Sequence, residues 1–157
     1  MKLVKVKGDS MSTTWYLRAT CASILWAALA SPTAVAQPGD AETPTGAQLT
    51  EQLQLVFNTA ADSQRRAANL EGGMAALPNA NAVGAVMNQY KSMVSWHAED
   101  PTSEGNQLHS TLVMNVGGLG SQSEALAWIW QDSGWKLSNS SLCSLANKVT
   151  RSRSCTP

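Results

Sequence analysis

Apolar side chains recur at helical spacing in the first segment after residue 45. Steps of three and four positions predict an amphipathic helix over residues 46–59. Its apolar stripe consists of Leu49, Leu53, Val56, Phe57 and Ala60. Thr45 stands at the N-cap position with Gln48 three residues later, which is the form of a capping box. The helix therefore has both a buried face and a defined start.

A short second helix is predicted within residues 62–73. Asp62 or Ser63 can cap its start, and Gly72 or Gly73 can end it in the left-handed conformation.

A third helix is predicted after Pro78, with Asn79 as its N-cap. Its buried stripe is Ala82, Val83, Val86, Met87 and Tyr90. A stripe of this kind is typical of a helix that packs on a core.

From residue 93 onward the period of the pattern changes to two, which indicates strands over residues 93–99, 106–116 and 123–132, followed by a fourth strand from Trp135. In the first strand one face holds Val94, Trp96 and Ala98, and the other holds Ser95, His97 and Glu99. In the second strand the inward set is Leu108, Leu112, Met114 and Val116. The segment GGLGS joins the second and third strands as a hairpin turn. Helices followed by antiparallel strands predict an α+β domain, with N-terminal helices packed on a curved four-stranded antiparallel sheet.

The third strand is apolar on both faces. Trp128 and Trp130 share one face with Leu126, and a face of smaller residues lies behind them. The smaller face consists of Ala125, Ala127 and Ile129. We expect the smaller face to pack closely against helices. The large aromatic side chains then form either a second core layer, the lining of a cavity or an interface.

The N-terminus has the pattern of a secretory signal peptide over residues 1–36. Basic residues precede an apolar run at 21–30, and Ala34-Val35-Ala36 forms a small-residue cleavage signal. Translation from Met11 would leave the same mature chain. Cys21 opens the apolar run, whereas a lipid-modified cysteine would close it, so we expect release with no membrane anchor. Residues 37–45 form a polar, proline-containing leader that we expect to be disordered.

The predicted mature chain has 121 residues, enough for one domain over residues 46–146. It carries seven Lys or Arg and ten Asp or Glu, a formal net charge of −3. The folded part has no basic stripe, which argues against nucleic-acid binding. Residues 147–157 form a basic tail. An even cysteine count in an exported chain predicts a disulfide between Cys143 and Cys155, which would contribute about 2–3 kcal/mol. Two free thiols, with Cys143 buried, are the alternative.

Residues suited to catalysis or metal binding are sparse. The two histidines, His97 and His109, have no ligand-like partner at suitable spacing, and no serine stands in a G-x-S-x-G motif. We therefore predict no catalytic residue, no metal site and no cofactor.

Three segments carry a family resemblance: PTGAQLTEQLQLVF at 44–57, NLEGG at 69–73 and GWKLSNSSL at 134–142. In this order and spacing the chain resembles the C-terminal domain of the mycobacterial low-molecular-weight secreted antigen family. The resemblance implies an exported actinobacterial protein with a nuclear-transport-factor-like (cystatin-like) fold. It carries over no catalytic residue. The pair of cysteines, the basic tail and the strand tryptophans depart from the family pattern.

Three functions remain open. The first is a secreted, non-catalytic protein that holds an apolar or lipidic ligand on the concave sheet face, using Trp96, Trp128 and Trp130. The second is a protein-interaction or homodimerisation domain with the same tryptophans at its interface, so we expect a monomer or a homodimer. The third is a small enzyme of the same superfold. That function is disfavoured, because His97 and Glu99 point away from the face that carries Trp96.

Overall fold

The computed structural model describes residues 42–151 and Cys155. The predicted signal peptide and residues 37–41 of the predicted leader lie outside this part. The helices are α1 (Gly46–Phe57), α2 (Ser63–Ala67), the 3-10 helix η2 (Gly73–Ala76), α3 (Leu77–Gln89) and α4 (Asn139–Thr150). The strands are β1 (Val94–Glu104), β2 (Gln107–Val116), β3 (Gly120–Gln131) and β4 (Gly134–Leu137).

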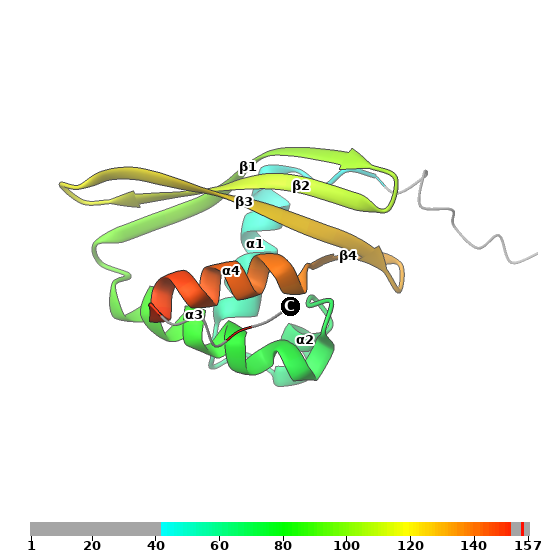
Figure 1. The fold of residues 1–157 in the computed structure, drawn as a ribbon, viewed down its shortest axis with the longest axis horizontal. Helices are drawn as coiled ribbons and strands as arrows, with labels where there is room; N and C mark the ends of the chain where they lie inside the picture. Colours follow the sequence, from blue (N-terminus) through cyan, green and yellow to red (C-terminus); the bar gives the residue numbers. More distant parts are fainter. Residues whose placement is uncertain (1–41, 152–154, 156–157) are drawn as a thin grey trace, which may run out of the picture. The chain divides into compact units, whose positions relative to one another are not determined.

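The four strands form one antiparallel meander in the order β1-β2-β3-β4. The sheet is curled, and the helices lie on one of its faces (Figure 1). Helix α1 contacts β1, α4 contacts β3, and α3 packs against both of these helices. The α+β architecture predicted from the pattern is therefore confirmed.

Helix α1 begins as predicted. The Thr45 hydroxyl accepts a hydrogen bond from the Gln48 backbone N–H, and the Gln48 side chain accepts one from the Thr45 backbone N–H at 2.7 Å. The helix ends at Phe57, two residues before the predicted end, so Ala60 lies in the exposed turn beyond it. The rest of the predicted apolar stripe is buried.

Helix α2 is capped as predicted, because Asp62 Oδ1 accepts a hydrogen bond from the Arg65 N–H at 2.8 Å. The prediction for α3 was wrong at its start. The helix begins at Leu77, and Pro78 occupies its first turn. Proline suits that position because its missing N–H would have no intrahelical partner there. Asn79 is therefore inside the helix and does not cap it.

Strand β1 runs to Glu104, five residues beyond its predicted end. The pairing register with β2 shifts between Glu99 and Thr102, and this bulge contains Pro101. A proline is tolerated there because β1 is an edge strand and a bulge leaves a residue unpaired. The alternation of polar and apolar residues predicted the strand only as far as Glu99.

The β2–β3 turn contains two glycines at positive φ, Gly118 at 78° and Gly120 at 91°. This confirms the hairpin that GGLGS predicted, because glycine reaches that region without a Cβ clash. Leu119 lies between the two glycines and is 84% exposed.

Strand β4 has only four residues and is followed directly by α4. The Ser138 hydroxyl caps the helix by accepting a hydrogen bond from the Ser141 N–H at 3.1 Å. Helix α4 has twelve residues and reaches Thr150, so it includes the first residues of the segment predicted as a basic tail. Ser138 is thus the N-cap, and Asn139, Ser140 and Ser141 form the first turn of α4.

The two faces of β3 are the reverse of our expectation. Leu126 and Trp128 are buried with the helix residues of the core, while Ala125 is exposed on the opposite face. The smaller face therefore does not pack against helices. A curled sheet leaves a deep space between itself and the helices, and large side chains fill that space better than alanines do.

Candidate functional site

Trp128 belongs to the hydrophobic core. Its side chain is 0% exposed. The indole Nε1–H donates a hydrogen bond to Ser110 Oγ at 2.9 Å, and Ser110 is itself buried. The polar edge of the ring is therefore satisfied inside the protein.

Trp130 packs against Trp135, its cross-strand partner on β4. Their ring centroids are 5.2 Å apart with an interplanar angle of 66°, an edge-to-face arrangement. Trp130 is half-buried, and Trp135 also donates its indole N–H to the Glu42 carbonyl at 3.3 Å.

Trp96 lies apart from the other two. It is opposite Met114 on β2, whereas Trp128 is opposite Leu108, six residues earlier on the same strand. Six residues of strand correspond to about 20 Å. Trp96 makes an edge contact with Phe57, with ring centroids 6.2 Å apart. The three tryptophans therefore do not form one continuous surface.

A small apolar cavity lies near Trp96, between the C-terminal half of α3 and the inner face of the sheet. We call it the apolar pocket; its volume is about 140 Å³. Helix α3 contributes Val86 and Met87, the C-cap residue Tyr90 follows them, and α4 contributes Val149. The sheet contributes Val94, Met114, Val116 and Gln122. The sequence pattern predicts most of these residues on a buried helix stripe or an inward strand face, but it does not indicate the cavity between them.

A second cavity of about 330 Å³ lies on the other side of α3, beside the end of α1. Trp96, Phe57 and Met87 form part of its wall. Its polar lining comes from Gln54, Asn58, Thr59 and Asn88. We call it the amide pocket, because side-chain amides dominate its polar groups.

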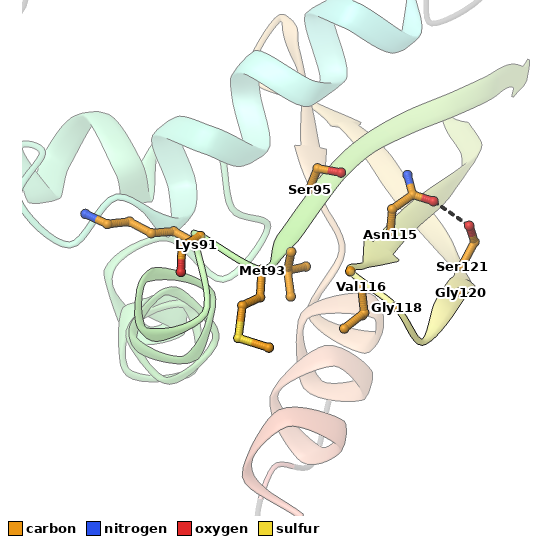
Figure 2. Close-up of a pocket in the computed structure, with 11 residues that line it drawn as sticks. Lys91, Met93, Ser95, Asn115, Val116, Gly118, Gly120 and Ser121 are labelled. Carbon is orange, nitrogen blue, oxygen red and sulfur yellow. Dashed lines mark hydrogen bonds between the residues drawn. The ribbon is translucent and has the colours of Figure 1, made fainter.

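A third hollow, of about 450 Å³, lies at the turn end of the β2–β3 hairpin, beside the start of β1 (Figure 2). Backbone and small side chains form most of it, with Lys91 and Met93 on one side and Asn115 and Ser121 on the other. Asn115 and Ser121 hydrogen-bond to each other. Their polar groups are therefore engaged with each other.

Two ionisable residues of β1, His97 and Glu99, lie on the outer face of the sheet, whereas Glu124 of β3 lies on the inner face and pairs with Lys148 of α4. His97 Nε2 and Glu99 Oε1 are 2.5 Å apart, and both side chains are substantially exposed. They project from the face opposite Trp96, as the alternation predicted, and the exposed His109 shares that face. In residues 42–151 and at Cys155, no group of three or more His, Cys, Asp or Glu is placed to hold a metal ion.

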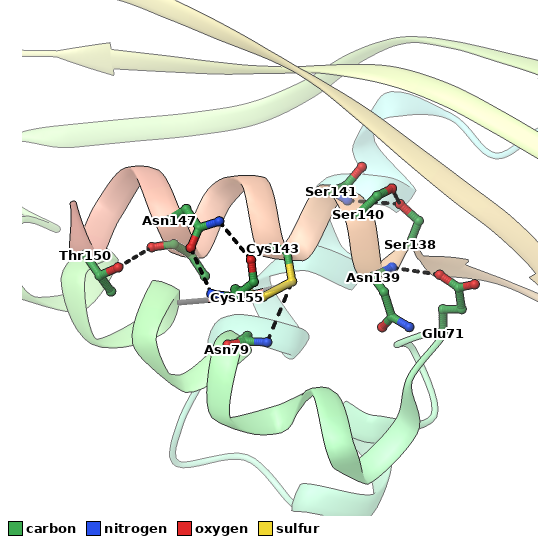
Figure 3. Close-up of a disulfide and its surroundings, with 11 residues drawn as sticks. Glu71, Asn79, Ser138, Asn139, Ser140, Ser141, Cys143, Asn147, Thr150 and Cys155 are labelled. Carbon is green, nitrogen blue, oxygen red and sulfur yellow. Dashed lines mark hydrogen bonds between the residues drawn. A yellow bond between two sulfur atoms is a disulfide. The ribbon is translucent and has the colours of Figure 1, made fainter. Parts of the chain in front are cut away.

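The predicted disulfide is confirmed. Cys143 on α4 is bonded to Cys155, with 5.3 Å between their Cα atoms. Asn147 accepts a hydrogen bond from the Cys155 N–H and donates one to its carbonyl, both at 3.2 Å (Figure 3). Cys155 is therefore held against α4 by a covalent bond and two hydrogen bonds.

Arg66 is a buried residue that the pattern did not indicate. Its side chain is 3% exposed. Its Nε–H donates to the Val56 carbonyl at 2.9 Å, and a terminal N–H₂ donates to Asn81 Oδ1 at 2.6 Å. The cation thus caps the C-terminal end of α1, where carbonyls lack helical partners. This role is structural.

Comparison with protein families shows to which family the folded part of the chain belongs. A family model, low molecular weight antigen MTB12, C-terminal domain, matches residues 42–153. The chain belongs to this family. The match confirms the resemblance seen in the sequence, and the MTB12 family is not a known enzyme family.

Neither the curated proteins nor the solved structures gave a match. None of the helices in the described residues has the length and apolar character needed to cross a bilayer.

Proposed function

We propose that this MTB12 family member is a secreted, non-catalytic protein that binds an apolar ligand at the inner face of its sheet. The observation that carries the proposal is the apolar pocket. Seven of its eight lining residues have apolar or aromatic side chains, and Gln122 supplies the one amide. This composition, a mostly apolar lining with few polar groups, is typical of ligand sites.

The size of the apolar pocket limits what it can hold. A volume of about 140 Å³ is close to that of apolar protein cavities that stay dry and bind a benzene-sized molecule. The pocket therefore suits part of an alkyl chain or a single ring. Trp96 has a supporting role in this proposal, because it lines the neighbouring amide pocket, whereas Trp128 and Trp130 are occupied in packing.

The experiment is a titration of the oxidised protein with N-phenyl-1-naphthylamine, an uncharged dye that fluoresces when it leaves water and whose single phenyl ring has the size that the apolar pocket accepts. Val116→Trp fills the apolar pocket from β2. Val113→Trp is the matched control, because it places the same side chain on the outer face of the same strand. We expect dye affinity to fall at least about tenfold in Val116→Trp and to be unchanged in Val113→Trp.

Native mass spectrometry of protein secreted by its own host supplies an independent test. A copurifying small molecule that disappears on denaturation supports the proposal. Failure of the dye to bind, together with a ligand-free dimer in the spectrum, would refute it in favour of a homodimerisation domain.

Export and the finer fold class are also part of the proposal. The disulfide and the MTB12 family support secretion after cleavage at Ala36. The secreted chain should therefore begin at Gln37. Its mass should be 2 Da below that of the dithiol form, since a disulfide lacks two hydrogens. The curled sheet with α1 against its inner face supports a nuclear-transport-factor-like (cystatin-like) fold. Superposition of an experimental structure on such folds tests that assignment.

A further inference from the structure

The apolar pocket and the amide pocket share one wall residue, Met87. Val86 of α3 and the C-cap residue Tyr90 line the apolar pocket, whereas Gly84 and Asn88 of α3 line the amide pocket. The sheet beneath shows the same division. Trp96 lines the amide pocket, and its cross-strand partner Met114 lines the apolar pocket. The two pockets therefore meet where Met87 lies over the Trp96–Met114 pair.

Methionine is an adaptable partition between two cavities. Its side chain is unbranched, has three rotatable bonds and fills irregular spaces readily. Met87 is half-buried and packs against the edge of the core. A change of rotamer at this one residue would widen the space between α3 and the sheet, because Met87 is the one residue that lines both pockets. With volumes of about 330 and 140 Å³, the joined pockets reach the size of an ordinary small-molecule site.

The chemistry of the two pockets differs in polarity but not in charge. The amide pocket offers Gln54, Asn58 and Asn88 as hydrogen-bond donors and acceptors, with the Thr59 hydroxyl beside them. Among the described residues that line either pocket, none carries a formal charge. Neutral amides and hydroxyls satisfy an uncharged polar group well, whereas a carboxylate moved there from water would lose hydration without gaining a counter-charge.

We infer that the two pockets form one site for a neutral single-chain amphiphile. The alkyl chain occupies the apolar pocket and passes beneath Met87, and an uncharged head group rich in hydroxyls, an ester or an amide occupies the amide pocket. This inference rests on the proposed function, because it names the class of ligand and the position of its head. The apolar pocket alone is too small for a whole lipid, and the amide pocket supplies the additional space.

The first experiment compares two ligands with the same chain, monododecanoylglycerol and dodecanoate, at a pH where dodecanoate is ionised. Displacement of N-phenyl-1-naphthylamine below the micellar concentration gives both affinities. We expect the glycerol ester to bind at least about tenfold more tightly. Asn88→Lys places a cation at the amide pocket and should move the preference toward dodecanoate by about tenfold or more. Gln89→Lys is the control, since Gln89 is exposed on the same helix and lines neither pocket.

A second variant separates the two proposals. Ala60 is exposed and lines the amide pocket only, so Ala60→Trp fills that pocket and leaves the apolar pocket intact. Ala60→Trp should bind the dye normally and lose at least about tenfold in affinity for the glycerol ester. If the dye binds but the two dodecyl ligands bind equally and neither variant changes their ratio, this inference is overturned and the proposed function stands. If neither the dye nor any dodecyl ligand binds, both are wrong.

Discussion

The hydrogen bond between Trp128 and Ser110 offers a direct test of how completely the inner face of the sheet excludes water at its centre. Both side chains are buried, and the Nε1–Oγ distance is 2.9 Å. The two residues lie on adjacent strands in a diagonal relation, since Trp128 is opposite Leu108 and Ser110 is opposite Leu126. The perturbation is a double-mutant cycle of Ser110→Ala, Trp128→Phe and the combined variant.

The expected loss of unfolding free energy depends on which buried polar group each variant leaves without a hydrogen-bond partner. Ser110→Ala removes the acceptor and leaves a buried indole N–H without a partner, which costs about 1–3 kcal/mol. Trp128→Phe leaves the Ser110 hydroxyl without its donor and shrinks a ring that is 0% exposed, at a cost of about 2–4 kcal/mol. The combined variant contains neither orphan group. Its loss of unfolding free energy should therefore be smaller than the sum of the single losses by about 1–2 kcal/mol.

The assay is urea unfolding of the oxidised protein, followed by far-ultraviolet circular dichroism so that loss of a tryptophan does not alter the signal. Ser123→Ala is the control. Ser123 is exposed on the outer face of β3, and its replacement should change stability by less than about 0.5 kcal/mol. Strictly additive losses, or a Ser110→Ala variant as stable as the control, would refute the reasoning, because water would then be reaching the indole.

Three further changes have expected outcomes in the same unfolding assay. Replacing Cys143 and Cys155 with serine should lower stability by about 3 kcal/mol, from a sequence separation of 12, and reduction of the wild type should reproduce the loss. Gly84→Ala should lower stability by roughly 1–3 kcal/mol, because a Cβ there would lie 2.2 Å from a carbonyl oxygen at the end of α1. A Cβ at the control position Gly134 meets nothing within 4 Å, so Gly134→Ala should be nearly neutral. Equal effects of the two variants would contradict the packing of α3 on α1. Thr45→Ala should cost about 1 kcal/mol, and Thr45→Ser should retain the cap; an alanine variant of wild-type stability would show that the capping box contributes nothing.

The candidate site was predicted only in part. The alternation correctly placed Trp96 on the inner face and His97 on the outer face, and the tryptophan-rich strand correctly pointed to the sheet. The alternation could not distinguish Trp128, whose indole N–H is hydrogen-bonded to buried Ser110, from Trp96, which borders a cavity. A pattern of period two states which residues share a face, but not which of them meet a helix and which meet a gap. The partition at Met87 is invisible for the same reason.

Local chemistry was sufficient for the features whose atoms lie close together in the chain. The capping box at Thr45, the cap at Asp62, the glycine turn before β3 and the alternation of the strands all depend on residues a few positions apart. The disulfide also followed from the sequence, because only two cysteines remain after residue 36.

Tertiary structure decided the features that depend on competition between distant segments. Strand β3 is apolar on both faces, so which face turned inward depended on the depth of the space beneath a curled sheet. Strand β1 continued through Pro101 because β2 was present to pair with the residues beyond the bulge. The charge of Arg66 became buried because the end of α1 supplied a carbonyl that needed a donor. In each case the free energy came from a partner that the local pattern does not contain.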